Sequence, residues 1–137
     1  MLRWTLLASL AVLPAQAATL EVVIGNVRTA SGTVRASVCT AETFLADSCA
    51  VNGRVKARVG EVVVTFPNLP PGTYAVQAHL DEDDDNRIGR NFFGIPREGL
   101  GFSNDAPFRF GPPSFNDAAV SLGPAGGRIR FSLRYFD

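Results

Sequence analysis

The sequence has few of the residues on which several common functional sites depend. It contains one His, His79, which excludes a zinc site made of several histidines. The only Lys, Lys56, lies outside any glycine-rich phosphate-binding motif, which excludes a P-loop nucleotide site. Thirteen Lys and Arg residues balance 13 Asp and Glu residues, so the sequence lacks the basic excess that favours nucleic acid.

A hydrophobic run long enough to span a membrane is also missing. The apolar run Trp4–Leu13 would form a helix of about 15 Å, half of the roughly 30 Å of a bilayer core. Arg3 precedes this run, and a small-x-small pattern follows it at residues 15–17. This arrangement is typical of a secretory signal peptide.

We therefore predict a signal peptide at residues 1–18, cleaved after Ala17 or Ala18. One domain over residues 19–137 would remain, and its length suits a single hydrophobic core. We expect this domain to be exported, either to the periplasm or into the medium, with no membrane span after cleavage. The alternative is an N-terminal helix that stays buried in the domain.

Only two cysteines are present, and they form no Cys-x-x-Cys redox motif. In an oxidising compartment, an even pair of cysteines predicts a disulfide, here between Cys39 and Cys49. A metal site at this position would need further ligands, and the segment between the cysteines offers only Glu42 and Asp47. Two free thiols are the alternative.

Hydrophobic and polar residues alternate with period two along the rest of the chain, which is typical of strands with one wet face. The 13 Gly and nine Pro residues supply many turns. We therefore expect an all-β fold, an antiparallel Greek-key sandwich of about seven strands. The apolar positions that define these strands fall in seven ranges: Leu20–Ile24, Val34–Val38, Val55–Val59, Val62–Phe66, Tyr74–Leu80, Ala118–Leu122 and Ile129–Tyr135.

A Pro-rich turn lies between two of these strands, with Phe66, Leu69, Gly72 and Tyr74 in an F-x-x-L-x-x-G-x-Y pattern. Prolines fix φ and Gly72 supplies the freedom that a tight turn needs. The pattern resembles a turn of transthyretin-like (prealbumin-like) and collagen-binding-B-type sandwiches, where it is a structural landmark. On the two strands that this turn joins, we expect Phe66 and Tyr74 to point inward.

Five consecutive carboxylates follow the predicted strand Tyr74–Leu80. Each adjacent pair costs on the order of 1 kcal/mol at about 4 Å in water, and a bound cation would remove this cost. Calcium is bound by oxygens at alternate positions of a tight loop, which is the spacing of Asp81, Asp83 and Asp85. The sequence therefore predicts a possible calcium site.

This loop departs from an EF-hand because Phe92 takes the twelfth place, where EF-hands have a bidentate Glu. Further ligands must come from elsewhere, and the candidates are the Glu98 carboxylate and the Asn91 amide oxygen. Two alternatives stay open: a solvated acidic turn that pairs with neighbouring arginines, and a site for a different metal.

Residues 91–115 lose the strand pattern and contain six Phe. A loop of this length in a small domain is usually functional or disordered, and its aromatic content argues against disorder. One interpretation is a ligand surface formed by Phe92, Phe93, Phe102, Ser103 and Asn104. The other, which we favour for most of the Phe side chains, is that they plug an open end of the core.

Three sequence blocks resemble a known family: Asp81-x-Asp83-x-Asp85-Asn86-x-Ile88, Gly94-Ile95-Pro96-x-Glu98-x-x-Gly101-Phe102-Ser103-Asn104 and Gly111-Pro112-Pro113-Ser114-Phe115. This family is the bacterial domain of unknown function numbered 2141, and the resemblance runs from the first predicted strand to Tyr135. It implies an exported β-sandwich protein and brings no activity. The family often has Asn at the position of Asp83 or Asp85, which keeps an oxygen ligand there.

An enzyme would need a placed nucleophile or an acid–base pair. A triad of His79, an Asp and Ser103 can be drawn, but Ser103 lies in no G-x-S-x-G elbow. We therefore expect a non-catalytic extracytoplasmic binding or adhesion module, with a protein or glycan partner and calcium as the possible cofactor. The alternatives are a structural cell-envelope protein without metal and a hydrolase.

Overall fold

The structure is a computed structural model, and it describes residues 4–8, 17–45, 49, 51–85 and 98–136. Eight strands form most of this part of the chain: β1 (Ala18–Val27), β2 (Thr33–Cys39), β3 (Val51–Lys56), β4 (Gly60–Leu69), β5 (Gly72–Asp81), β6 (Leu100–Phe102), β7 (Ala119–Leu122) and β8 (Gly127–Ser132). The described residues contain two short helices, η1 (Ser103–Asp105) and α1 (Phe115–Ala118). The prediction of an all-β fold is confirmed.

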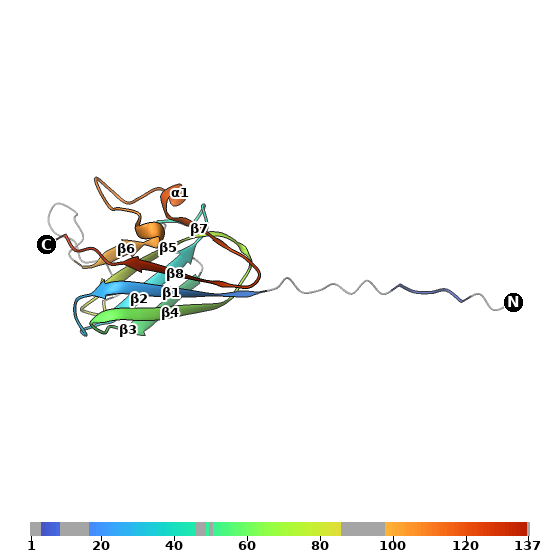
Figure 1. Cartoon of the computed structure of the whole chain (residues 1–137), viewed down its shortest axis with the longest axis horizontal. Coiled ribbons are helices and arrows are strands. Elements are labelled where there is room, and N and C mark those ends of the chain that lie inside the picture. The colour runs from blue at the N-terminus through green and yellow to red at the C-terminus, as the bar shows by residue number, and fades with distance from the viewer. Residues whose placement is uncertain (1–3, 9–16, 46–48, 50, 86–97, 137) are drawn as a thin grey trace.

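The strands form two sheets that lie over one another as layers (Figure 1). The smaller sheet has the order β4-β1-β8. The larger sheet has the order β3-β2-β5-β6, and β7 also pairs with β5. The chain crosses between the layers several times, so each sheet combines strands that are distant in the sequence.

The period-two pattern accounts for the core between the sheets. Alternate residues point inward and meet in one hydrophobic cluster, in which Ile24, Val34, Val64, Leu80 and Phe131 are fully buried. The turn between β4 and β5 behaves as predicted, because Phe66 and Tyr74 both pack against this cluster. The transthyretin-like name itself stays a prediction.

Three features of the fold correct the sequence-based expectations. First, the sandwich is not wholly antiparallel, because β1 and β8 pair in parallel. Second, the strand expected at Val55–Val59 is displaced toward the N-terminus, and Val59 lies exposed in the turn that follows β3. Third, the segment expected to be irregular contains β6, which pairs with β5. Each of these features depends on pairing with a distant strand, which a local pattern does not encode.

Several other phenylalanines form a second hydrophobic cluster outside the main core. Phe102 and Phe115 both pack edge-on against Phe44, with ring centroids 6.1 and 6.0 Å away. The cluster includes Ala75 of β5, whose neighbour Val76 belongs to the main core, so it covers the outer face of the larger sheet. Phe102 and Phe115 are therefore packed, but the prediction that they plug an open end of the core is wrong, because they cover a face of the sandwich. Phe110, by contrast, is fully exposed.

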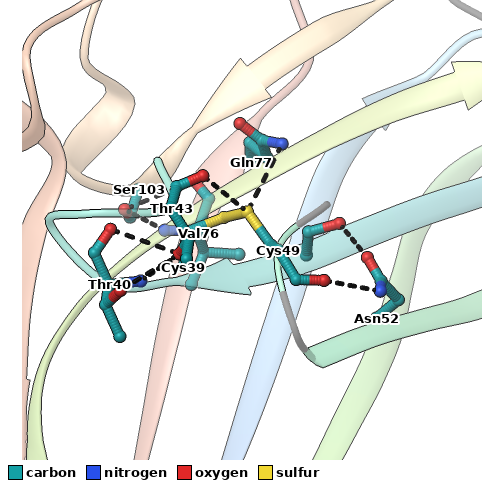
Figure 2. Close-up of a disulfide and its surroundings, with 9 residues drawn as sticks. Cys39, Thr40, Thr43, Cys49, Asn52, Val76, Gln77 and Ser103 are labelled. Carbon is teal, nitrogen blue, oxygen red and sulfur yellow. Dashed lines mark hydrogen bonds between the residues drawn. A yellow bond between two sulfur atoms is a disulfide. The ribbon is translucent and has the colours of Figure 1, made fainter. Parts of the chain in front are cut away.

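The predicted disulfide joins Cys39 and Cys49, with a Cα–Cα distance of 5.2 Å. Both cysteines are buried, and Figure 2 shows Thr43 and Gln77 beside the sulfur of Cys49. The bridge closes a short loop whose Phe44 ring packs into the second hydrophobic cluster. It therefore anchors part of the cover over the larger sheet.

Residues 4–8 form neither helix nor strand, and Trp4, Leu6 and Leu7 are exposed. Across the part of the chain that the structure describes, no helix is long and apolar enough to cross a membrane. The signal peptide and the domain boundary at residue 19 stay predictions.

Candidate metal centre

The acidic turn begins where β5 ends, at Asp81. The backbone N–H of Asp84 donates to the Asp81 carbonyl oxygen at 3.4 Å, and that of Asp85 donates to Asp81 Oδ1 at 3.2 Å. Asp84 has a φ of 54°, a left-handed conformation that Asp tolerates better than most residues. The turn therefore folds back on the Asp81 side chain and brings successive carboxylates together.

Four carboxylates meet at this turn, those of Asp81, Asp83, Asp85 and Glu98. Each offers one oxygen, and these four oxygens all lie within 4.8 Å of one another. The structure thus brings together four of the five residues that the sequence singled out as metal ligands. The fifth, Asn91, lies outside the described residues.

Burial divides these carboxylates into two pairs. Asp81 is 0 % exposed and Glu98 is 6 % exposed, whereas Asp83 and Asp85 are exposed. Desolvation, a side-chain hydrogen bond with Asp81 and the negative charge of Asp85 raise the pKa of Asp83 above its ordinary value. A raised carboxyl pKa means that the negative form is disfavoured here, which a bound cation would reverse.

An arginine on the neighbouring strand orients the most buried of these carboxylates. Arg35 of β2 donates from Nε to Asp81 Oδ2 at 2.7 Å, and its side chain is 20 % exposed. This bond supplies a positive charge to Asp81 and fixes its carboxylate plane. The other oxygen, Oδ1, is the one that accepts the Asp85 N–H within the turn.

The turn between β1 and β2 supports the acidic turn from the side. Gly32 has a φ of +83°, and a Cβ at this position would lie 1.9 Å from the Asp81 carbonyl oxygen. Only glycine fits this close approach. Thr33 adds a hydroxyl bond to Asp84 Oδ1 at 2.5 Å, and Arg28 Nε pairs with Glu82 Oε1 at 2.6 Å.

Glu98 joins the acidic turn from a different segment of the chain. The backbone N–H of Glu82 donates to Glu98 Oε2 at 3.2 Å, which ties this carboxylate to the acidic turn. Glu98 lies just before β6, a strand that the alternation pattern does not predict, and β6 pairs with β5. The pairing explains why a residue so far along the chain returns to Asp81.

His79 lies two residues before Asp81 on the same face of β5, directly opposite Arg35 in the register of β2 and β5. Its Nε2 atom is buried and has no hydrogen-bond partner among the described residues. Desolvation lowers the pKa of His79, and the nearby Asp81 carboxylate works in the opposite direction. His79 is therefore mainly neutral at pH 7.

The ligand surface proposed from the sequence needs correction. Phe102 and Ser103 are 3 % and 0 % exposed, so neither contributes to an outer surface. Ser103 Oγ accepts the Val76 N–H at 2.9 Å and donates to the Ala118 carbonyl oxygen, so its hydroxyl bonds to backbone groups rather than to His79.

The other three residues of the predicted ligand surface are Phe92, Phe93 and Asn104. Asn104 is exposed, and its side-chain amide holds the end of α1 by donating to the Ala119 carbonyl oxygen at 2.8 Å. Phe92 and Phe93 lie outside the described residues. The burial of Phe102 and Ser103 was not predicted, because the pairing of β6 with β5 has no signal in the local sequence pattern.

Three residues that support the acidic turn were not predicted from the sequence: Arg28, Arg35 and Gly32. The alternation of polar residues along β2 places Arg35 on the wet face, and that was visible in the sequence. The pairing of Arg35 with His79 and the contact with Asp81 depend on the register between β2 and β5. That register was not available from the sequence pattern.

Oxygens in this arrangement can bind a hard divalent cation. Calcium takes oxygen ligands at about 2.3–2.6 Å, so oxygens on opposite sides of the ion are about 5 Å apart. Four oxygens within 4.8 Å of one another fit around one such ion. Backbone carbonyls and water would complete its coordination.

Comparison with known families supports the resemblance noted in the sequence. The model of a family described as an uncharacterized protein conserved in bacteria (DUF2141) matches residues 22–130 of the chain. The matched region spans both sheets and includes the whole acidic cluster. No curated protein matches the chain, and no solved structure does.

Proposed function

The chain belongs to the bacterial DUF2141 family, and we propose that it is an exported, non-catalytic binding or adhesion module whose acidic cluster binds calcium. Because the family is uncharacterised, the proposal rests on the residues of this chain. The observation that carries it is the convergence of Asp81, Asp83, Asp85 and Glu98, with four oxygens within 4.8 Å.

Burial makes this cluster different from a solvated acidic surface. Asp81 and Glu98 are almost completely buried, and carboxylates are seldom buried without charged or hydrogen-bonding partners. Arg35 supplies one positive charge to Asp81. A calcium ion would supply two more at the point where the negative charge is densest.

Export is supported by the buried Cys39–Cys49 disulfide, since such bonds persist mainly in oxidising compartments. The predicted signal peptide at residues 1–18 fits the same compartment. Extracellular calcium reaches concentrations at which modules with Kd values of about 10⁻⁴–10⁻³ M are filled. The proposed partner is a protein or a glycan, with the ion ordering the acidic turn beside it.

A calcium titration of thermal unfolding tests the proposal. With a Kd near 10⁻⁴ M, about 10 mM calcium should stabilise the protein by roughly 2.7 kcal/mol. For a domain of this size, the melting temperature should rise by about 10 °C. Asp83→Ala should abolish most of this rise, because it removes an exposed ligand without disturbing the core.

Glu42→Ala is the matched control, because Glu42 is an exposed carboxylate in a turn away from the cluster. It should keep the full calcium response. An equal response to magnesium would contradict calcium as the ion, since magnesium holds its waters more tightly. No response to either ion would leave the alternative of a structural envelope protein without metal.

The hydrolase alternative has its own test. It requires a hydrolytic activity that His79→Ala or Ser103→Ala removes. The backbone hydrogen bonds of Ser103 argue against a nucleophilic role, because its hydroxyl is already committed to Val76 and Ala118.

A further inference from the structure

Tyr135, near the C-terminal end of the chain, connects to both segments that carry the acidic cluster. Its hydroxyl donates to the Asn26 carbonyl oxygen at 2.7 Å and accepts the backbone N–H of Arg28 at 3.0 Å. These two bonds fix the last residues of β1 and the residue that follows the strand. They hold the segment from which the Arg28 side chain extends toward the acidic turn.

Arg28 carries this connection to the acidic turn. Its guanidinium lies over the Tyr135 ring, 4.3 Å from the centroid, in a cation–π contact. Its Nε atom also lies 2.6 Å from Glu82 Oε1. Glu82 in turn donates its backbone N–H to Glu98 Oε2, so three contacts in sequence link the Tyr135 ring to a carboxylate of the cluster.

The Tyr135 ring also contacts the second acidic segment directly. A Cβ at Gly99 would lie 2.6 Å from the Tyr135 ring, so the ring packs against the backbone next to Glu98. Beside this contact, Leu100 and Arg134 exchange two backbone hydrogen bonds, of 3.0 and 2.9 Å. The C-terminal segment therefore holds Glu98 in place through its neighbours in the chain.

We infer that Tyr135 is a positioning residue of the calcium site, and that docking of the C-terminal segment Leu133–Phe136 and calcium binding stabilise one another. The inference rests on the proposed function, because it concerns the regulation of the same site. Residues outside the ligand set orient metal ligands and change affinity without touching the ion. Coupling of this kind is reciprocal, so the ion must also stabilise the docked C-terminal segment.

The matched residue for a control is Tyr74, the other tyrosine of the chain. Both tyrosines are partly buried and pack against the main hydrophobic core. The Tyr74 hydroxyl donates to the Pro70 carbonyl oxygen before β5, at the end of that strand opposite to Asp81. If lost packing alone weakens calcium binding, substitution of either tyrosine should weaken it. If lost positioning of the ligands is the cause, only substitution of Tyr135 should.

The test measures the calcium Kd by titration calorimetry for the purified protein and three variants. Tyr135→Leu should raise the Kd about tenfold, the loss typical of residues that support metal ligands. Tyr135→Phe keeps the ring contacts with Arg28 and Gly99 and should raise the Kd less. Tyr74→Leu should stay within about twofold of the unsubstituted protein, because distant sites act independently.

Amide hydrogen exchange of the unsubstituted protein provides a second readout that needs no variant. Calcium should slow exchange at the Leu100 and Arg134 amides, which join the C-terminal segment to β6. The Gly126 amide, in the turn at the other end of β8, should change much less. This measurement decides the question even if Tyr135→Leu fails to fold.

The outcomes separate the two proposals. If the unsubstituted protein binds no calcium, the proposed function fails and the inference falls with it. If it binds calcium but Tyr135→Leu binds equally well, or if exchange at Leu100 and Arg134 is unaffected, the site stands and the role of Tyr135 is overturned.

Discussion

At the scale of the residue, Asp81 determines the charge balance of the cluster. It is fully buried, and Arg35 is bonded to one of its oxygens. Breaking a buried ion pair by removing one partner leaves an uncompensated charge, which is more costly than the loss of the bond itself. Without a metal ion, Arg35 therefore contributes to the compensation of the Asp81 charge.

We predict that Arg35→Gln destabilises the calcium-free protein by about 2 kcal/mol, below the full cost of a buried pair because Arg35 is partly exposed. At 10 mM calcium, about 100 times the expected Kd, the difference from the unsubstituted protein should shrink, because the ion takes over part of the compensation. Urea unfolding in EDTA and in calcium measures both quantities. Arg128→Gln, which removes an exposed pair with Glu21, should have little effect. An unchanged calcium-free stability of Arg35→Gln would contradict the role of Arg35 in compensating the charge of Asp81.

His79 gives the stability a pH dependence. Because its pKa is lowered in the folded protein, the unfolded chain binds a proton more readily near pH 6. Stability should therefore be full above the ordinary His pKa of about 6.5 and fall as the pH drops below it. Asp81, Arg35 and Asp85 are the charged groups that act on His79, and His79→Gln leaves all three in place.

Urea unfolding in EDTA between pH 5 and pH 7.5 measures the contribution of His79 to stability. This contribution is the difference in the free energy of unfolding between the unsubstituted protein and His79→Gln. The unsubstituted protein should lose more stability toward acid than His79→Gln. Parallel curves would show that His79 titrates alike in the folded and unfolded states.

These residues also show how far a sequence predicts a site. Asp81, Asp83 and Asp85 could be recognised from the sequence because they occupy every second position of one short acidic segment. Glu98 was only the nearest further carboxylate, and its place in the cluster depends on β6 pairing with β5. Arg28, Arg35 and Tyr135 come from three other segments, so their roles required the three-dimensional structure.

At the scale of the element, alternation predicted the strands that have one buried face, such as β2 and β5. It failed for β6, which is buried on both faces and has only the residues Leu100–Phe102. A strand of this length and composition carries no period-two pattern. Alternation also failed to predict the parallel pairing of β1 with β8, because this pairing joins two strands that are distant in the sequence.

The disulfide acts at this scale, because it anchors the loop that covers the larger sheet. Replacing both Cys39 and Cys49 with Ala should lower the free energy of unfolding by roughly 2–3 kcal/mol. The melting temperature should fall by about 10 °C. Mass spectrometry of the unsubstituted protein should find it two hydrogens lighter than its reduced form. A reduced mass for the protein isolated from its native cells would contradict the disulfide and weaken the case for export.

At the scale of the whole molecule, the sandwich places the acidic cluster where several connections meet. The turn after β1, the end of β5, the segment before β6 and the C-terminal segment all contribute to it. These segments are far apart in the sequence, and the pairing of the two sheets brings them together. An ion at this position would join several parts of the fold rather than a single loop.

The measurement that tests this account most directly is a crystal structure of the protein grown with calcium. We predict anomalous density between Asp81, Asp83, Asp85 and Glu98, with oxygen distances of about 2.3–2.6 Å. The weakest Kd expected for an extracellular calcium site is about 1 mM, so the crystals should be grown well above this concentration. If the density among these carboxylates then fits water alone, the account is contradicted.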